Sequence, residues 1–278
     1  ERGADIPIAA QPVTPDDATQ MGIFRFDGRG HISGFEEKPT AARLGEMGTS
    51  VPSGPLARQI TPDKPFMASM GIYVFSRDVL HEVLQRDRAV DFGREIIPNA
   101  IKSHRVHAHF YNGFWADVGT VSSFYDVNLM LTRHGAPFNF FHPTRPIYTR
   151  PRFLPATQVH HSEIDQTLIS EGCYVDNNCR ITESVVGIRT AISENARISR
   201  SVLLGADYYE ESTGDIRLGI GRNTVLDKVI VDKNARIGDD VTLVNERNIQ
   251  HADGDGYYIR SGIIIVPKNG VVKPGTVV

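Results

Sequence analysis

The sequence predicts a mixed α/β domain followed by a β-solenoid, and three observations support this fold class. Aliphatic residues recur at steps of five or six from residue 164 to residue 203, and the series resumes from residue 220 to residue 243. Three such steps make seventeen residues, which gives the pattern a second, longer period. The N-terminal half has no such repeat and instead mixes short apolar runs with an amphipathic stretch. The thirteen in-phase positions are Ile164, Ile169, Val175, Ile181, Val186, Ile192, Ile198, Leu203, Ile220, Leu226, Val231, Ile237 and Leu243.

This double period is typical of short strands wound into a triangular coil with one inward aliphatic residue on each side. Each coil buries its apolar face only against the next coil, so the stack itself is the core. A β-sandwich with strands of similar spacing is the alternative, but it gives no reason for so many positions to stay in phase. We therefore expect a solenoid domain over residues 158–278.

The strands of the first domain are predicted from short apolar runs bounded by turn residues. Residues 6–10 form one strand, and residues 22–26 and 32–36 form a hairpin across a turn at 27–30. The almost continuous apolar run at residues 68–75 predicts a strand that is buried on both faces. Alternation at residues 106–111 predicts a further strand of the same domain.

Two helices are predicted around these strands. Residues 77–85 are amphipathic, with Val79, Leu80, Val83 and Leu84 on one helical face. Thr120 is a candidate N-cap for a helix that runs through Val127 and Leu131.

The remaining segments of the chain are predicted to be loops, connections or interruptions of the repeat. Residues 39–65 are expected to be mostly loop, and residues 132–157 are expected to connect a first domain at 1–131 to the solenoid. Within the solenoid, residues 205–219 break the phase and should protrude as a loop. A second interruption at residues 245–258 precedes a closing strand at 261–266.

Composition limits the kinds of partner. The 278 residues are 40% hydrophobic and 23% charged, with a formal net charge of −3 and no basic run. A main partner that is a nucleic acid or an anionic membrane is therefore not expected, and no apolar run is long enough to span a bilayer. Cys173 and Cys179 fall inside the repeat without metal-ligand spacing, so we expect reduced, structural thiols. The chain opens at Glu1 without an initiator Met or a signal peptide, and we expect a fragment.

Three polar clusters lie at the ends of apolar strands, where α/β folds place ligands. In Glu36-Glu37-Lys38, a carboxylate can accept hydrogen bonds from sugar hydroxyls while the ammonium meets a phosphate; a solvated surface is the alternative. Ser69 begins the longest apolar run and could equally be a plain strand-end hydroxyl. Asp117 is flanked by apolar residues and suits either a hard-cation ligand or a helix cap.

Taken together, six short motifs in register with the solenoid give the chain a specific resemblance. In this order they resemble the motifs of glucose-1-phosphate adenylyltransferase, also called ADP-glucose pyrophosphorylase. The resemblance covers essentially the whole chain and implies a doubly wound, Rossmann-like nucleotidyltransferase domain followed by a left-handed parallel β-helix. The motifs are Phe35-Glu36-Glu37-Lys38-Pro39, Ser69-Met70-Gly71-Ile72-Tyr73-Val74-Phe75, Asp91-Phe92-Gly93, Trp115-Ala116-Asp117-Val118-Gly119-Thr120, Pro146-Ile147-Tyr148-Thr149 and Gly205-Ala206-Asp207-Tyr208-Tyr209.

The resemblance also implies roles for individual residues. Gly22, Glu37, Lys38 and Ser69 would line a glucose 1-phosphate site, with Lys38 against the phosphate and Gly22 allowing close backbone approach. Asp117 would be one of two aspartates that hold a catalytic Mg²⁺, so Lys38 and Asp117 are the expected catalytic residues. The family's Gly-rich phosphate loop and its other metal-binding aspartate are expected upstream of Glu1, and the fragment alone is expected to be inactive.

The reaction that the resemblance implies is transfer of the adenylyl group of ATP to α-D-glucose 1-phosphate, giving ADP-glucose and pyrophosphate for glycogen or starch synthesis. The enzyme is expected to be a cytoplasmic homotetramer. Lys233 and Lys268 are similar to positions where relatives bind a phosphorylated metabolite as activator, and Lys233 should lie on the outside of the coil because it falls between two inward aliphatic residues. The alternative is that both are ordinary solvated lysines.

Three rival functions share parts of this pattern. A sister nucleotidyltransferase that uses UTP, dTTP or GTP would share both domains, and a catalytically silent regulatory subunit could keep Glu37 and Lys38. A hexapeptide acyltransferase would share only the solenoid. It would usually need a catalytic histidine between coils, whereas His160, His161 and His251 are predicted at the edge of the solenoid or in a loop.

Overall fold

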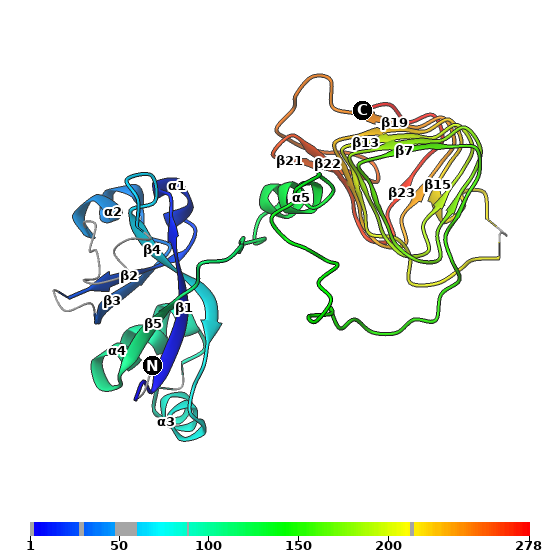
Figure 1. Cartoon of the computed structure of the whole chain (residues 1–278). Helices are drawn as coiled ribbons and strands as arrows, with labels where there is room; N and C mark the ends of the chain where they lie inside the picture. The colour runs from blue at the N-terminus through cyan, green and yellow to red at the C-terminus, as the bar shows by residue number, and fades with distance from the viewer. Residues whose placement is uncertain (1–2, 28–30, 48–59, 88, 212–213) are drawn as a thin grey trace. The chain divides into compact units, whose positions relative to one another are not determined.

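The computed structural model describes residues 3–27, 31–47, 60–87, 89–211 and 214–278. Within it the chain forms two compact units, Glu1–Trp115 and Ala116–Val278 (Figure 1). The predicted turn at residues 28–30 and the middle of the predicted loop at 48–59 lie outside the described residues.

The first unit is built on a five-stranded sheet in the order β3-β2-β4-β1-β5. Strands β1 and β5 are parallel, and the other neighbours in the sheet are antiparallel. The predicted hairpin is confirmed, because β2 pairs with β3 from Gly22 opposite Glu37 to Phe26 opposite Ile32. The strands are β1 (Ile6–Val13), β2 (Gly22–Phe26), β3 (Ile32–Glu37), β4 (Phe66–Tyr73) and β5 (Val106–Phe110).

The prediction that the strand at 68–75 is buried on both faces is only half right. Its first part, from Met67 to Met70, is buried, but the Ile72 and Val74 side chains are 52% and 60% exposed. The reason is the length of its neighbour: β2 reaches β4 only at the pair Ile23–Ala68, so the end of β4 is flanked by β1 alone.

The described helices of this unit include several that the sequence did not predict. The amphipathic helix α3 was predicted, and Val83 is buried as expected, but Leu84 is 42% exposed and does not belong to the buried face. Helix α2 lies in the segment expected to be loop. It forms because Leu44 and Met47, one turn apart, pack into the cluster of apolar residues around Ile23. The elements are α1 (Pro15–Ala18), α2 (Ala41–Met47), α3 (Arg77–Asp87), the π-helical turn η2 (Phe92–Ile96) and α4 (Ile97–Ser103).

The second unit is the predicted solenoid. Its short strands stack into three parallel sheets, in the orders β19-β16-β13-β10-β7, β22-β17-β14-β11-β8 and β23-β18-β15-β12-β9-β6. Strands one coil apart pair in register, as in Ile164–Ile181–Ile198. The strands are β6 (Gln158–Val159), β7 (Glu163–Asp165), β8 (Leu168–Ile169), β9 (Tyr174–Val175), β10 (Arg180–Thr182), β11 (Val185–Val186), β12 (Ala191–Ile192), β13 (Arg197–Ser199), β14 (Val202–Leu203), β15 (Gly219–Ile220), β16 (Val225–Asp227), β17 (Val229–Val231), β18 (Arg236–Ile237), β19 (Thr242–Val244), β20 (His251–Asp253), β21 (Tyr258–Arg260), β22 (Ile263–Val266) and β23 (Val271–Val272).

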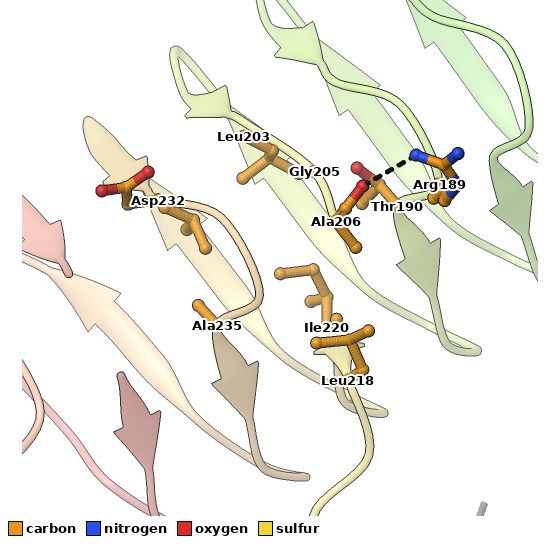
Figure 2. Close-up of a pocket in the computed structure, with 11 residues that line it drawn as sticks. Arg189, Thr190, Leu203, Gly205, Ala206, Leu218, Ile220, Asp232 and Ala235 are labelled. Carbon is orange, nitrogen blue, oxygen red and sulfur yellow. Dashed lines mark hydrogen bonds between the residues drawn. The ribbon is translucent and has the colours of Figure 1, made fainter. Parts of the chain in front are cut away.

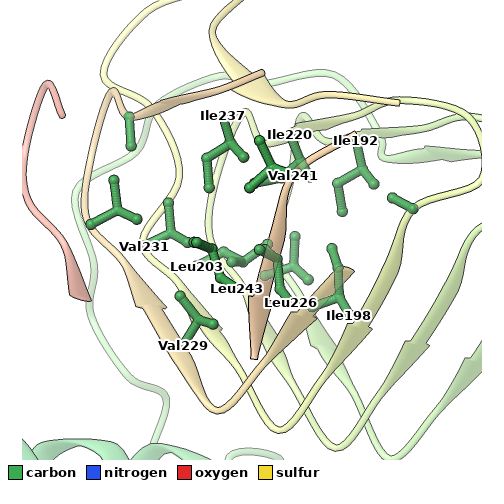
Figure 3. Close-up of a cluster of buried hydrophobic side chains, with 14 of the residues drawn as sticks. Ile192, Ile198, Leu203, Ile220, Leu226, Val229, Val231, Ile237, Val241 and Leu243 are labelled. Atoms are coloured by element: carbon green, nitrogen blue, oxygen red, sulfur yellow. The ribbon is translucent and has the colours of Figure 1, made fainter. Parts of the chain in front are cut away.

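The core of the coil consists of the in-phase aliphatic residues. Eleven of the thirteen predicted positions, from Val175 to Leu243, are at most 5% exposed, and the labelled side chains in Figure 3 point into the coil. Ile164 is 36% exposed and Ile169 is half-buried. These two lie in the first coil, which has a paired neighbour on one side only, so the difference follows from the stacking principle itself.

The predicted loop at 205–219 is confirmed as an insertion between β14 and β15. Gly205 and Gly219 bracket it, with φ of +83° and +107°. A Cβ at Gly205 would lie 2.1 Å from the Ile188 carbonyl oxygen, and one at Gly219 would lie 2.3 Å from that of Ala191, so only glycine fits at the two points where the chain leaves and rejoins the coil. The pocket between them has a volume of about 20 Å³, room for one water molecule, and a hydrogen bond from Arg189 to the Ala206 carbonyl closes one side (Figure 2).

The second predicted interruption of the repeat is confirmed, and it is an ordered hairpin. Residues 245–258 contain β20 and begin β21. These two strands form an antiparallel hairpin that pairs with β22 and extends one face of the solenoid. Ile259 is buried in the solenoid core, and this explains why the hairpin stays attached.

Helix α5 (Val121–Met130) confirms the predicted helix and its cap. The Thr120 hydroxyl accepts a hydrogen bond from the Ser123 backbone N–H in a reciprocal capping box. The helix packs on the solenoid: the Tyr125 hydroxyl donates to the Arg200 carbonyl oxygen at 2.6 Å, and Leu129 joins the same apolar cluster as Val202. The division into compact units therefore falls after residue 115, upstream of the domain boundary expected at residue 131. Among the described residues, no helix has both the length and the apolarity that crossing a bilayer requires.

Candidate functional site

The Glu37 carboxylate occupies a confined position at the end of β3. Glu37 lies opposite Gly22 in the hairpin ladder. A Cβ added to Gly22 would come within 2.7 Å of Glu37 Oε2, and one added to Gly93 would come within 2.6 Å of the same oxygen. The carboxylate therefore lies close to the backbone of two glycines, Gly22 of β2 and Gly93 of η2.

The charges around Glu37 come from three residues of the same unit. Burial raises the pKa of Glu37 most, the Asp91 carboxylate raises it further, and the cations of Lys38 and Arg94 oppose both effects. Asp91 is held in place as the cap of η2, where its Oδ1 accepts a hydrogen bond from the Arg94 backbone N–H at 2.8 Å. The site thus combines a partly desolvated carboxylate with a nearby anion and two nearby cations.

Lys38 follows the strand in an unusual backbone conformation. Its φ is +48°, and its backbone N–H donates to the Met21 carbonyl oxygen at 3.0 Å, which holds this turn against β2. Its side chain is exposed, while Pro39 after it is buried. An exposed ammonium on a fixed turn beside a confined carboxylate can meet a phosphate without breaking an internal contact.

Tyr73, which the site prediction missed, links Ser69 to Glu37. Ser69 is 7% exposed, and its hydroxyl accepts a hydrogen bond from the Gly71 backbone N–H at 3.2 Å and shares one with the Tyr73 phenol. Burial raises the pKa of Tyr73, the hydrogen bond with Ser69 lowers it, and the Glu37 carboxylate raises it. The Tyr73 ring also stacks on Phe92, with centroids 5.9 Å apart.

The structure therefore brings four predicted residues of the first unit, Gly22, Glu37, Lys38 and Ser69, into one region between the ends of β2, β3 and β4. It adds residues that sequence reasoning had not assigned to a site: Tyr73, Asp91, Gly93 and Arg94. A signal for three of them was present, because Tyr73, Asp91 and Gly93 stand within the motifs that carried the resemblance.

Asp117 lies in the second unit, and its carboxylate is exposed. The alternative that it caps the following helix is wrong, because Thr120 is the cap. No group of three or more potential metal ligands occurs among the described His, Cys, Asp and Glu residues. A single free carboxylate still suits Mg²⁺, which commonly takes one or two protein carboxylates and completes its shell with water and substrate phosphates.

Lys233 and Lys268 converge on one acidic residue of the insertion. Lys233 Nζ lies 2.8 Å from Asp207 Oδ1, and Lys268 Nζ lies 3.4 Å from Asp207 Oδ2. Lys233 is on the outside of the coil as predicted, with 36% of its side chain exposed. The two lysines belong to turns of adjacent coils, because the Asn269 N–H donates to the Lys233 carbonyl oxygen.

The histidines that the sequence analysis named and the two cysteines of the solenoid lie in or beside its strands. His161 Nδ1 is 3.1 Å from the Asn177 side-chain oxygen, His160 packs against the Tyr174 ring, and His251 lies in β20. Cys173 and Cys179 are free and buried, as predicted, and burial raises the pKa of both thiols.

Comparison with known families gives two successive matches along the chain. Residues 1–134 match a family model described as nucleotidyl transferase, and residues 152–277 match one described as GLGC left-handed parallel beta-helix domain. The chain is thus a nucleotidyltransferase domain followed by a left-handed parallel β-helix, which is the domain composition of a sugar-phosphate nucleotidyltransferase. Its β-helix is of the GLGC type, and the left hand expected from the resemblance is confirmed.

Proposed function

We propose that this chain belongs to an enzyme that transfers the adenylyl group of ATP to α-D-glucose 1-phosphate, giving ADP-glucose and pyrophosphate for glycogen or starch synthesis. The observation that carries the proposal is the pairing of a confined carboxylate, Glu37, with an exposed ammonium on the next residue, Lys38. A sugar phosphate presents hydroxyl donors beside a dianionic phosphate, so it needs an acceptor and a cation side by side. The GLGC-type β-helix supports ADP-glucose over other products of this reaction class.

Each residue then has a chemical task. Lys38 binds the phosphate of glucose 1-phosphate as a point charge, and Glu37 accepts hydrogen bonds from the sugar. Ser69 and the Tyr73 phenol add hydrogen-bond donors for the sugar, and Gly22, which has no side chain, lets the Glu37 carboxylate lie close to β2. The phosphate oxygen of the bound sugar phosphate attacks the α-phosphorus of ATP, and the bond to the pyrophosphate breaks.

Asp117 is the residue of this chain that we assign to Mg²⁺. The bound ion would neutralise charge on the phosphates. Its exposed carboxylate is free of protein hydrogen bonds and ion pairs among the described residues, so it can take up a cation without first losing a partner. We also propose that the enzyme is a homotetramer and that it acts in the cytoplasm.

The test is the kinetics of Lys38→Gln in the complete enzyme that contains this chain. A charge-assisted contact is worth about 1.5–3 kcal/mol, so the KM for glucose 1-phosphate should rise by roughly one to two orders of magnitude while the KM for ATP changes little. Lys102→Gln, at an exposed position on α4, is the matched control and should leave both constants unchanged. If Lys38→Gln raised the KM values for both substrates equally, Lys38 would not be the residue that binds the phosphate of glucose 1-phosphate. A panel of ATP, UTP, dTTP and GTP distinguishes the sister nucleotidyltransferases, and absence of turnover with all four would favour a regulatory subunit.

We further propose that a phosphorylated metabolite acts as effector at Lys233 and Lys268. Two cations on turns of adjacent coils suit a phosphate ester. Their convergence on the single carboxylate of Asp207 supports the proposal, because it indicates that the two ammonium groups can be bridged by one small anion.

A further inference from the structure

The contact between η2 and Glu37 extends the proposed sugar-phosphate site by one residue. A Cβ added to Gly93 would lie 2.6 Å from Glu37 Oε2, 3.0 Å from Cδ and 3.4 Å from Cγ. Real Cβ atoms do not approach other heavy atoms to 2.6 Å, so any side chain at this position would have to move the Glu37 carboxylate.

The π-helical turn η2 explains how Gly93 reaches this place. Asp91 caps the turn through the Arg94 N–H, and Phe92 packs against the Tyr73 and Phe75 rings at 5.9 Å. The Asp91–Arg94 hydrogen bond spans Phe92 and Gly93, the packed Phe92 ring holds the first of these two residues, and Gly93 is the one that faces Glu37. Single π-helical turns often mark functional sites, and this one closes the site opposite β2.

We infer that Gly93 is a positioning residue of the sugar-phosphate site. Because glycine has no side chain, the Glu37 carboxylate can occupy the place in which it binds the sugar. The inference rests on the proposed role of Glu37 in sugar binding. The Gly22 backbone lies close to the same carboxylate oxygen, so a methyl group on Gly93 must displace the carboxylate away from both backbones. A displaced acceptor no longer matches the sugar hydroxyls, and misplacement by about 1 Å can cost up to a hundredfold in rate.

Gly22 and Gly93 differ in what a methyl group would meet. At Gly22 it would also lie 2.2 Å from the ring of Phe35, which is buried, so a change there damages the core as well as the site. At Gly93 the three nearest atoms of the described residues all belong to the flexible side chain of Glu37. Gly93→Ala should therefore separate a defect in the site from a defect in folding.

The experiment uses Gly93→Ala in the complete enzyme, with Gly45→Ala as the matched control. Gly45 lies in α2, and a Cβ there would meet no atom within 4 Å. We expect Gly93→Ala to keep the melting temperature of the native protein and to raise the KM for glucose 1-phosphate roughly tenfold, with the KM for ATP unchanged. Gly45→Ala should change neither constant.

Rescue gives a second readout that a purely structural role would not move. Glu37→Asp shortens the side chain by one methylene and relieves the clash, so its effect and that of Gly93→Ala should be strongly non-additive in a double-mutant cycle. In the purified 278-residue chain, carboxyl-carbon NMR should show the pKa of Glu37 falling toward its ordinary value in Gly93→Ala, because the carboxylate moves out of its desolvated position.

The outcomes separate this inference from the proposal on which it rests. If Glu37→Gln leaves the KM for glucose 1-phosphate unchanged, the proposed role of Glu37 fails. If Glu37→Gln raises that KM but Gly93→Ala behaves like Gly45→Ala, the assignment of Gly93 is overturned while the proposed function stands. Multiplicative effects in the cycle, or a melting temperature lowered by several degrees, would likewise overturn it.

Discussion

Lys233 Nζ lies 2.8 Å from Asp207 Oδ1, across 26 residues of sequence. Asp207 belongs to the insertion between β14 and β15, whereas Lys233 follows β17 on the coil. Asn234 strengthens the contact, since its side chain donates to Asp207 Oδ2 and accepts from the Asp207 backbone N–H. With Lys268 on the same carboxylate, three groups of two successive coils hold the start of the insertion in place.

This arrangement predicts the titration of Asp207. The hydrogen bond from Lys233, the one from Asn234 and, to a smaller extent, the contact with Lys268 lower the pKa of Asp207 from 3.8 to about 2, against an opposing effect of burial. Because the folded pKa is depressed, the ion pairs contribute to stability above pH 3.8, and the contribution is lost as the pH falls through about 2. Carboxyl-carbon NMR of the purified chain should show a midpoint near 2, and Lys233→Gln should move it toward 3.8. A midpoint near 3.8 in the unaltered chain would show that the contact does not persist in solution.

The proposed role of Asp117 predicts a kinetic defect without a loss of stability. Asp117→Asn keeps the shape of the side chain but weakens a cation site, so kcat of the complete enzyme should fall by roughly a hundredfold or more and recover in part at high Mg²⁺. The melting temperature should not change, because the side chain is exposed and caps no helix. Thr120→Ala is the informative control: it removes the true cap and should cost about 1 kcal/mol of stability, with kcat retained. Turnover of Asp117→Asn at the unaltered rate would remove the residue from the metal site.

Stacking of the coils predicts at which positions shortening an inward side chain lowers the free energy of unfolding most. Leu226 is fully buried, with Ile198 on the coil before it and Leu243 on the coil after it. Leu226→Ala should therefore lower the free energy of unfolding by about 2–5 kcal/mol, measured by urea unfolding followed by circular dichroism. Ile164→Ala removes an equivalent inward side chain from the first coil, where it is 36% exposed, and should cost much less. Equal costs at the two sites would contradict the idea that each coil buries its face only against its neighbours.

The period of the solenoid was predictable because each inward residue depends on a local six-residue unit. The β20–β21 hairpin was not, since its stability depends on the edge of β22 and on burial of Ile259, both of which are tertiary facts. Helix α2 was missed for a similar reason: its propensity is weak, and Leu44 and Met47 gain their stability by packing on Ile23.

The candidate site shows the same limit. Glu37 and Lys38 are neighbours in sequence and could be singled out together. Gly93 lies beside Glu37 only because of the fold of η2. Tyr73 lies near Ser69 because of the local conformation of β4, which the sequence pattern does not reveal. For Lys233, the sequence predicted the outward direction, but its partner Asp207 lies in an insertion whose path no repeat pattern describes.

The contact between Lys233 and Asp207 also affects the proposed binding of an effector. An anionic metabolite that binds Lys233 and Lys268 must first displace the Asp207 carboxylate, and this internal competition lowers its apparent affinity. Asp207→Asn removes the competing charge, so the half-activating concentration of the effector should fall several-fold, whereas Lys233→Ala and Lys268→Ala should raise it roughly tenfold or more. The measurement is a titration of the complete enzyme with 3-phosphoglycerate, fructose 6-phosphate and fructose 1,6-bisphosphate, at saturating substrates. Lys273→Ala, whose ammonium pairs with Asp255 instead, is the matched control and should leave the half-activating concentration unchanged. An unchanged value in Lys233→Ala and Lys268→Ala would place the effector elsewhere, and a raised value in Asp207→Asn would mean that the carboxylate organises the lysines for the ligand and does not compete with it.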